Sequence, residues 1–322
     1  MLIFYLLLLI FFSFVLIKAT EILVEVLNKL SRISGIGKFA LTSFLLALAT
    51  SFPELFVGIT SALEKHPILA LGNVLGANIA NLSLVIGGAA FLGGSIAVVG
   101  DFLKQDIFYA FLAGGLPLIF LMDDRLSRVE GLLLLAIYGV YNFTVLKGER
   151  RSKRKQTVRK FFQRMNHSHV DRHLAWLFFG IALLIFSADN LVKIGVLVAE
   201  SFQVPVLLIG LFLISIGTTL PELSFGLKAV IKKESAMIFG NLLGSIVANS
   251  TLILGLVALI QPIYLDGGFK VYLVASIAYI VIFVIFWFFV RTKKKLERWE
   301  GAVLLLAYFV FMFFEFWRLD GK

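Results

Sequence analysis

Unbroken apolar segments, each long enough to cross a lipid bilayer, fill most of this chain. The hydrocarbon core of a bilayer requires about 20 apolar residues per helix. Candidate spans lie at 1–27, 39–63, 67–92, 102–122, 127–146, 172–200, 204–231, 235–260, 268–290 and 299–317. A helix satisfies its own backbone hydrogen bonds, and continuous apolar runs favour helices over alternating β-strands. The sequence therefore predicts an all-α membrane protein with ten transmembrane helices.

The composition agrees with a membrane protein and excludes several kinds of site. Hydrophobic residues make up 60% of the chain and charged residues only 16%, whereas about a quarter of the residues in soluble domains are charged. The chain has no cysteine, which excludes disulfide bonds and thiolate-bound metals. The first span lacks a basic segment before it, so we expect it to remain in the membrane rather than to be cleaved as a signal peptide.

Lysine and arginine residues are concentrated on one side of the ten-span arrangement. The segment 147–171, between the fifth and sixth spans, is rich in both. Because basic loops stay in the cytoplasm, we expect this segment to be cytoplasmic and both termini to lie outside the cell membrane. A basic segment beside a membrane contacts anionic lipid or binds a regulatory partner. The expected partners are membrane lipid and transported cations, not nucleic acid, and the sequence does not indicate an oligomeric state.

The chain repeats itself at a fixed offset, at which position 50 corresponds to position 218. Residues 50–55 read Thr-Ser-Phe-Pro-Glu-Leu, and residues 218–223 read Thr-Thr-Leu-Pro-Glu-Leu. Residues 72–81 and 240–249 match at the same offset, because both begin with Gly-Asn and end with Ala-Asn.

This repeat predicts two five-helix halves, 1–146 and 172–322, joined by the basic linker 147–171. Because each half has an odd number of spans, the second half must insert upside down relative to the first. Inverted repeats are typical of secondary transporters whose substrate site lies near the middle of the membrane.

Two glutamates, Glu54 and Glu222, occupy equivalent positions inside apolar segments. An ionised side chain at the bilayer centre costs roughly 2.5–3.5 kcal/mol or more, so such residues usually face a cavity or a partner. Inverted repeats would bring the two together between the halves. Proline precedes each glutamate, and a proline within a helix leaves the carbonyl four residues earlier without its hydrogen bond. The alternative is that each glutamate is protonated or paired inside the bundle.

Hydroxyl and amide side chains accompany the two glutamates. Thr50 and Thr218 lie four residues before a glutamate and so share its helix face. The candidate ligands besides the glutamates are Thr50, Ser51, Asn73, Asn81, Thr218, Thr219, Asn241, Ser245 and Asn249. Any single hydroxyl can instead bond to its own helix.

All of these candidate ligands are oxygen donors. Hard cations such as Ca²⁺ bind about six to eight oxygens from carboxylates, carbonyls and water, whereas softer metals prefer cysteine or histidine. The four histidines, His66, His167, His169 and His173, lie in predicted loops or at the end of a span. The sequence therefore predicts a site for a hard cation.

The paired Pro-Glu and Gly-Asn…Ala-Asn segments resemble the α-repeats of the Ca²⁺:cation antiporter superfamily, specifically its sodium/calcium exchanger branch of the prokaryotic type. The resemblance covers both halves and implies ten transmembrane helices in two inverted repeats. It implies that Glu54 and Glu222 are shared Ca²⁺ ligands and that Asn81 and Asn249 line the centre. It also implies flanking Na⁺ sites formed by Thr50, Ser51, Thr218, Thr219 and Ser245, with main-chain oxygens near Ala47 and Ser215.

Three positions depart from the family pattern. Ala49 stands where the family usually has glycine, and Ala77 stands where it usually has serine, so we expect one flanking Na⁺ site to be weakened. Asn249 stands where K⁺-dependent members have aspartate, which argues against K⁺ co-transport. The Pro-Glu pairs favour sodium coupling, because the proton-coupled branch typically shows a Gly-Asn-Ala-x-Glu pattern.

These features predict a secondary active antiporter that exchanges Na⁺ for Ca²⁺ by alternating access at a midplane two-glutamate site. The alternative on the same scaffold is a Ca²⁺/H⁺ or other cation/proton antiporter. A cation channel would instead allow flux without a counter-ion. An intramembrane enzyme is disfavoured because the acidic pair Asp123-Asp124 has no second acidic cluster beside it. We therefore expect no enzyme activity and no cofactor, only transported Ca²⁺ and Na⁺.

Overall fold

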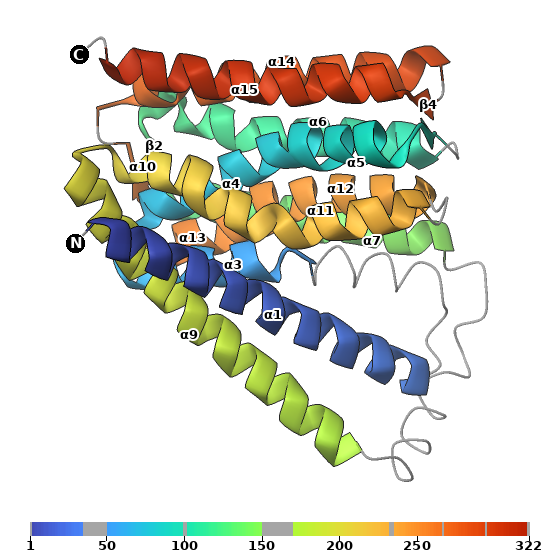
Figure 1. Cartoon of the computed structure of the whole chain (residues 1–322), viewed down its shortest axis with the longest axis horizontal. Coiled ribbons are helices and arrows are strands. Elements are labelled where there is room, and N and C mark those ends of the chain that lie inside the picture. The colour runs from blue at the N-terminus through green and yellow to red at the C-terminus, as the bar shows by residue number, and fades with distance from the viewer. Residues whose placement is uncertain are drawn as a thin grey trace.

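The described part of the protein is a bundle of helices with two very short sheets (Figure 1). The computed structural model describes residues 2–34, 50–98, 102–149, 170–231, 235–265, 267–293 and 295–320. The described helices of the first half are α1 (Leu2–Ser34), α3 (Phe52–Leu63), α4 (Pro67–Ala80), α5 (Ile86–Gly93), α6 (Phe102–Phe120) and α7 (Arg128–Glu149). The helices of the second half are α9 (Val170–Phe202), α10 (Val206–Leu208), α11 (Ser215–Ile231), α12 (Ser235–Val247), α13 (Leu254–Ile260), α14 (Leu273–Lys293) and α15 (Arg298–Asp320). Short 3₁₀ turns, η2 (Leu121–Asp123) and η5 (Phe269–Tyr272), connect some of them.

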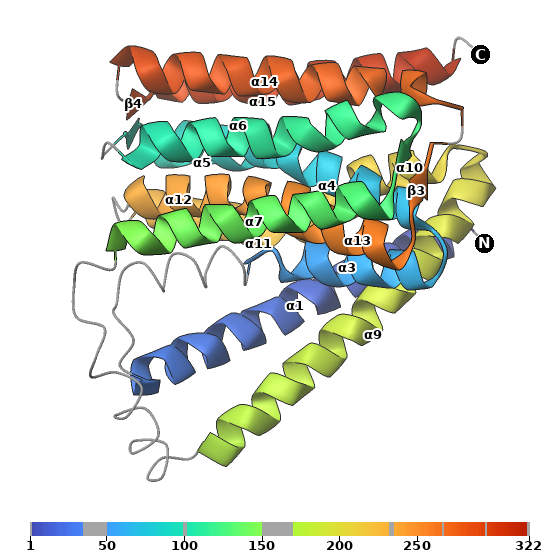
Figure 2. The ribbon, with the colours of Figure 1, turned by 180° about the vertical axis from the view of Figure 1, so that it is seen from behind.

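Helices recur in the structure at the same offset as the sequence repeat. Both α1 and α9 have 33 residues, and the bounds of α9 are those of α1 shifted by the offset of the repeat. The start of α12 likewise corresponds to the start of α4 at that offset. The helices α1 and α9 pack against each other, run in opposite directions, and lie obliquely to the rest of the bundle (Figures 1 and 2).

Three of the helical segments contain wide π-helical turns. These turns are η1 (Asn81–Val85) between α4 and α5, η3 (Ile209–Ile214) between α10 and α11, and η4 (Ala248–Ile253) between α12 and α13. Such turns are frequent at functional sites in helices. Because η1 begins at Asn81 and η4 contains Asn249, both candidate central amides lie on widened turns.

The two halves interlock through close contacts between glycines. A Cβ atom placed on Gly87 of α5 would lie 2.9 Å from the carbonyl oxygen of Gly301 on α15. On the other side of the repeat, a Cβ atom on Gly255 of α13 would lie 2.9 Å from the carbonyl oxygen of Gly131 on α7. Small residues allow membrane helices to approach this closely, so each half packs a helix against the last helix of the other.

Two antiparallel strand pairs also join the halves. The strand β1 (Ile96–Ala97) pairs with β4 (Lys295–Leu296), and β2 (Arg125–Leu126) pairs with β3 (Ile263–Tyr264). In each pair one strand comes from the first half and the other from the second.

Eight helices in the described part of the chain are long and apolar enough to cross a membrane. They are Ile3–Leu23, Pro67–Gly93, Asp106–Asp123, Ala175–Phe202, Val206–Ile231, Met237–Ile260, Phe269–Thr292 and Arg298–Arg318. The predicted spans 39–63 and 127–146 are not among these eight. The first is described only from residue 50 onward, where α3 is a shorter apolar helix, and the second corresponds to α7. The prediction of a helical membrane protein is confirmed, while the count of ten spans stays a prediction.

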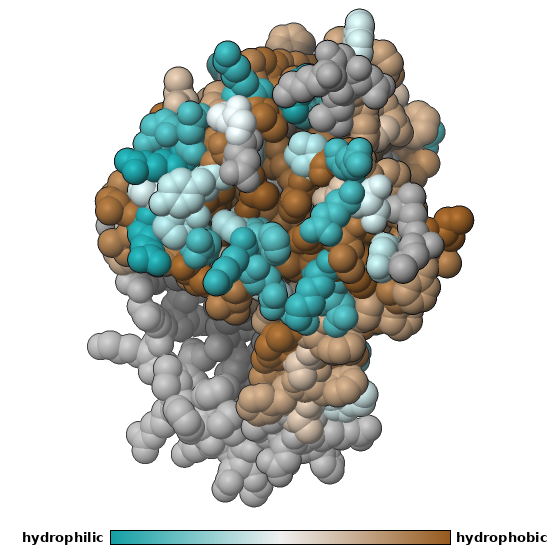
Figure 3. Space-filling model, turned by 90° about the vertical axis from the view of Figure 1, so that its left-hand side faces the viewer, coloured by the Kyte–Doolittle hydropathy of each residue, from teal (hydrophilic) through white to brown (hydrophobic). Residues whose placement is uncertain are grey.

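The surface of the bundle is polar at one end and apolar along its sides. The helix α1 begins and α15 ends at the same end of the bundle (Figure 1), and Figure 3 shows hydrophilic residues gathered across that end. Large aromatic side chains that are more than half exposed include Phe14, Phe178, Phe288, Phe313 and Trp317. Contiguous apolar surface of this kind marks an interaction with a membrane or another protein, and here it lies on helices that are long enough to span a bilayer.

Candidate cation-binding site

The two glutamates singled out by the repeat are buried in the bundle. Glu54 lies in the first turn of α3 and Glu222 lies within α11, and their exposed fractions are 0% and 1%. Pro53 stands in the first turn of α3, where a backbone N–H would have no partner within that helix, and the carbonyl four residues earlier, that of Ala49, lies outside the described residues. Pro221 instead lies inside α11, so it removes the hydrogen bond that would reach the carbonyl of Gly217.

The glutamates lie close to each other and to threonines of the opposite half. The carboxylate of Glu222 interacts electrostatically with that of Glu54. The hydroxyl of Thr218 lies beside the carboxylate of Glu54, and that of Thr50 lies beside Glu222. None of the four carboxylate oxygens makes a well-formed hydrogen bond with another described residue. The site therefore brings two carboxyl groups together from opposite halves.

No basic side chain among the described residues forms an ion pair with either carboxylate. Lys18 pairs with Glu21 at 2.7 Å. Lys193 pairs with Asp189 at 2.9 Å and with Glu64 at 3.6 Å. Buried charges are strongly unfavourable unless they are compensated. The alternative that the glutamates are paired with a cationic side chain therefore finds no partner in this part of the chain. Protonation of the glutamates stays an alternative to a bound cation.

Mirrored hydrogen bonds cross between the halves next to the glutamates. The hydroxyl of Thr50 donates to Oδ1 of Asn241 at 3.0 Å, and the hydroxyl of Thr218 donates to Oδ1 of Asn73 at 3.2 Å. Thr218 and Asn241 are the counterparts of Thr50 and Asn73 in the repeat, so the two bonds are equivalent. Both asparagines use their amide oxygens as acceptors in these bonds. In the described arrangement they therefore orient the threonine hydroxyls.

The hydroxyls near the glutamates differ between the halves. Ser51 and Ser245 are buried, and their oxygens have no partner among the described residues. Thr219, the counterpart of Ser51, donates to the carbonyl of Ser215 at 2.8 Å. The hydroxyl of Ser215 donates to the carbonyl of Leu211 at 2.5 Å. The alternative of bonding to the same helix thus describes Thr219 and in part Thr218, whose hydroxyl lies 3.2 Å from both the carbonyl of Ser215 and Oδ1 of Asn73. Ser51 and Ser245 remain available to a ligand.

The expected main-chain ligands are described only in the second half. Ala47 and Ala49 lie outside the described residues. The carbonyl of Ser215 accepts hydrogen bonds from Thr218 at 3.2 Å and from Thr219 at 2.8 Å. A carbonyl oxygen has two lone pairs, so a cation would bind there only if one of these hydroxyls turned away.

The two central amides have different surroundings. Both amide atoms of Asn81 are buried without a partner among the described residues. Nδ2 of Asn249 donates to Oδ1 of Asn78 at 3.3 Å, and Oδ1 of Asn249 is buried without a described partner. Each residue can therefore offer one amide oxygen to a cation.

Asn78 and Ser250 are not among the site residues predicted from the sequence. Nδ2 of Asn78 donates to the hydroxyl of Ser250 at 2.7 Å, which links the two halves directly behind Asn249. The repeat gave no signal for these residues, because their counterparts, Ile246 and Leu82, are apolar. A buried asparagine inside an apolar helix was the only available signal.

The donor set fits a hard cation. Among the candidate ligands, oxygens that are buried without a described partner come from both carboxylates, two serines and two amides, namely Glu54, Glu222, Ser51, Ser245, Asn81 and Asn249. Ca²⁺ and similar ions prefer such ligands. Groups of three or more His, Cys, Asp or Glu side chains that could hold a metal ion do not occur among the described residues, so the hydroxyl and amide oxygens would have to complete the ligand set.

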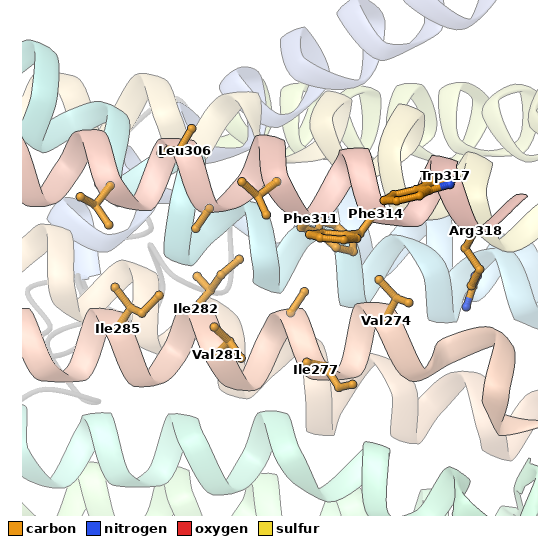
Figure 4. A pocket seen from close by; sticks show the side chains of 14 residues that line it. Val274, Ile277, Val281, Ile282, Ile285, Leu306, Phe311, Phe314, Trp317 and Arg318 are labelled. Atoms are coloured by element: carbon orange, nitrogen blue, oxygen red, sulfur yellow. The ribbon is translucent and has the colours of Figure 1, made fainter. Parts of the chain in front are cut away.

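A groove of about 820 Å³ lies elsewhere, between α14 and α15 (Figure 4). Its lining is apolar apart from Arg318 at one end. Arg318 donates to the carbonyls of Lys270 and Val271 and pairs with Glu315. The lining side chains of this groove offer no oxygen ligand, so the groove does not compete with the glutamate cluster as a cation site.

The acidic pair considered for an enzyme has a structural role. Oδ1 of Asp124 accepts a hydrogen bond from the backbone N–H of Phe269 at 2.6 Å. Asp123 pairs with Arg125 at 3.3 Å. The Asp124 bond joins the two loops that carry β2 and β3, whereas the Asp123 pair lies within the first of these loops.

Comparison with known proteins agrees with a transporter. The sodium/calcium exchanger protein family matches residues 4–147 and 172–317. The putative antiporter CaxA of Alkalimonas amylolytica is 30% identical over 296 residues, which cover 90% of this chain and 91% of that protein. The sodium/calcium exchanger MaX1 of Methanosarcina acetivorans is 28% identical over 332 residues, which cover 92% of this chain and 94% of that protein.

The fold also resembles a solved structure. The sodium-calcium exchanger NCX_Mj, soaked with Na⁺ and Sr²⁺, superposes with a TM-score of 0.65 at 22% identity, covering 96% of this chain and 98% of that chain. At this identity the likeness shows a shared fold.

Proposed function

The chain belongs to the sodium/calcium exchanger family of the Ca²⁺:cation antiporter superfamily, and on that premise we propose that it exchanges Na⁺ for Ca²⁺ at its buried two-glutamate cluster. Members of this family transport cations and are not enzymes. The observation that carries the proposal is the pair Glu54 and Glu222, whose four buried carboxylate oxygens have no well-formed hydrogen bond or basic partner among the described residues. Such a cluster attracts cations and is accessible to them only if the bundle changes shape.

Shared carboxylates explain how two ion fluxes are coupled. Two ionised glutamates balance one Ca²⁺ or two Na⁺, and a buried charge imbalance is costly. The ions therefore compete for Glu54 and Glu222, and binding of one kind expels the other. The hydroxyls of Ser51 and Ser245 would supply further oxygen ligands for Na⁺ beside the carboxylates.

Alternating access would follow from the repeat. We propose ten transmembrane helices in two inverted halves, 1–146 and 172–322, with the linker 147–171 in the cytoplasm and both termini outside. Inverted repeats allow one scaffold to expose a midplane site to either side in turn.

A proton-coupled antiporter is the second candidate. The same carboxylates could be neutralised by protons in place of Na⁺, because nothing else in the described part of the site compensates their charge. In that case Ca²⁺ uptake would follow a pH gradient without Na⁺.

Transport by purified protein in liposomes distinguishes these functions. Uptake of ⁴⁵Ca²⁺ is measured under an outward gradient of Na⁺, K⁺ or H⁺, with Glu54→Gln as the inactive control. We expect uptake with the Na⁺ gradient alone. Uptake driven by a pH gradient with no Na⁺ would favour the proton-coupled candidate. Uptake that needs no counter-ion gradient, with the membrane potential held at zero by an ionophore, would indicate a channel.

A further inference from the structure

Asn81 and Asn249 occupy equivalent places in the repeat, but only Asn249 is held by a hydrogen-bonded chain among the described residues. Nδ2 of Asn249 donates to Oδ1 of Asn78 at 3.3 Å, and Nδ2 of Asn78 donates to the hydroxyl of Ser250 at 2.7 Å. Asn78, Asn249 and Ser250 are at most 1% exposed. Because water does not compete at buried positions, such bonds fix side-chain orientation more strongly than surface bonds do.

The chain of bonds determines which end of the Asn249 amide is free. An asparagine amide has a donor end and an acceptor end. With Nδ2 bound to Asn78, the oxygen of Asn249 is the free end, and it is buried without a partner among the described residues. The reverse orientation would present N–H groups, which repel a cation. The observed orientation is the one in which Asn249 can act as a cation ligand.

The first half lacks this arrangement. The positions equivalent to Asn78 and Ser250 are Ile246 and Leu82, which have no polar atom in their side chains. Both ends of the Asn81 amide therefore remain without a described partner. The two central amides therefore differ because Asn249 has polar neighbours at positions where the other half has apolar residues.

We propose that Asn78 is a positioning residue that presents the amide oxygen of Asn249 to the transported cation. The second half then contributes a preset amide ligand, and the first half contributes an amide that can rotate between ligands. This inference rests on the proposed function, because it assumes that the glutamate cluster binds the cation.

The test is ⁴⁵Ca²⁺ binding at equilibrium to the purified full-length protein, with Na⁺ as the competitor. The Asn78→Leu variant removes both polar ends at nearly constant volume. We expect Ca²⁺ affinity to fall by roughly three- to tenfold, the range for losing one buried hydrogen bond. The control is Ile246→Leu at the mirrored position, for which we expect unchanged binding.

A second set of variants tests whether Asn78 affects Ca²⁺ binding by positioning Asn249 or by a general effect on the structure. In Asn249→Ala the oxygen to be positioned is gone, so adding Asn78→Leu should change Ca²⁺ affinity no further, whereas independent effects would add. Asn78→Asp keeps an acceptor for Nδ2 of Asn249, and the Ser250 hydroxyl can donate to its other oxygen, so it should bind Ca²⁺ at least as tightly as the wild type. If Asn78→Leu does not fold, the Asn78→Asp variant decides.

Three results would overturn the inference. They are wild-type affinity in Asn78→Leu, the same loss in the presence and absence of Asn249, and weakened binding in Asn78→Asp. A wild type that binds Ca²⁺ but does not exchange it for Na⁺ would overturn the proposed function alone. A wild type that binds no Ca²⁺ would overturn both.

Discussion

The hydroxyl of Thr50 donates a hydrogen bond to Oδ1 of Asn241, 3.0 Å away in the opposite half of the chain, and the mirrored bond from Thr218 to Asn73 measures 3.2 Å. The partners in each bond come from different halves, so the same bond is built twice around the glutamates. A threonine beside a carboxylate could act on its own helix alone, but here each one connects the two halves at the level of the site.

Removal of either threonine hydroxyl should therefore destabilise the protein. In Thr50→Val or Thr218→Val, a buried asparagine oxygen loses its donor, which costs about 1–3 kcal/mol. We expect the two variants to lower the unfolding temperature in detergent by similar amounts. Thr144→Val is the control, because Thr144 is exposed and bonds to its own helix. An unfolding temperature for Thr50→Val as high as that of the control would show that the bond between the halves contributes nothing.

Removal of either central charge should abolish exchange. In Glu54→Gln or Glu222→Gln one of two buried negative charges is lost, and the loss of one partner from a buried charged contact costs roughly 2–5 kcal/mol. We expect Na⁺-driven ⁴⁵Ca²⁺ uptake to fall to a few per cent of the wild type or less. Glu64→Gln is the matched control, because Glu64 is a partly exposed glutamate at the C-terminal end of α3. Normal flux in both central variants would remove these residues from the site.

The missing hydroxyl at position 77 should make the Na⁺ response asymmetric. Ala77 is fully buried, and its counterpart Ser245 has a buried hydroxyl without a described partner. Ala77→Ser should raise the apparent Na⁺ affinity by a few fold, and Ser245→Ala should lower it by a similar factor, as expected for about 1 kcal/mol per ligand contact. The measurement is the Na⁺ concentration that gives half-maximal Ca²⁺ flux. An unchanged Na⁺ dependence in both variants would exclude a ligand role for these hydroxyls.

Equivalent glycines of the repeat should respond in opposite ways to the same substitution. A Cβ atom on Gly72 would lie 2.3 Å from the carbonyl oxygen of Leu207, whereas one on Gly240 meets no described atom within 4 Å. Gly72→Ala should therefore destabilise the protein by about 1–3 kcal/mol or more through overpacking. Gly240→Ala should be neutral or stabilising by up to about 1 kcal/mol, because alanine favours a helix more than glycine does. Thermal unfolding of both variants in detergent checks this, and equal shifts would contradict the close approach of α4 to α10.

The sequence predicted the parts of this protein that depend on local patterns and on the repeat. Apolar run length predicted helices in a membrane, and the repeated Pro-Glu segments identified Glu54 and Glu222, which the structure brings together. Both predictions work because of the bilayer. A long apolar run indicates a membrane helix without any knowledge of its contacts, and a charged residue inside such a run indicates a functional site.

The sequence did not predict the features that depend on contacts between distant segments. Asn78 and Ser250 are far apart in the chain yet joined by a hydrogen bond, and no periodic pattern marks a bond at such a separation. The π-turns at Asn81 and Asn249 also escaped prediction, because a wide turn depends on how neighbouring helices crowd the backbone. Bonding of a hydroxyl to its own helix was an alternative for every candidate, and the sequence did not indicate that Thr219 adopts it while its counterpart Ser51 does not.

The interlocking of the halves has a consequence for how the protein assembles. The contacts Gly87–Gly301 and Gly255–Gly131, together with the strand pairs β1–β4 and β2–β3, all connect one half with the other. A half produced alone would leave a glycine-lined helix face and two strand edges uncovered, so neither half is a complete folding unit. We therefore expect the two halves to fold together as one cooperative unit, although the sequence is a repeat.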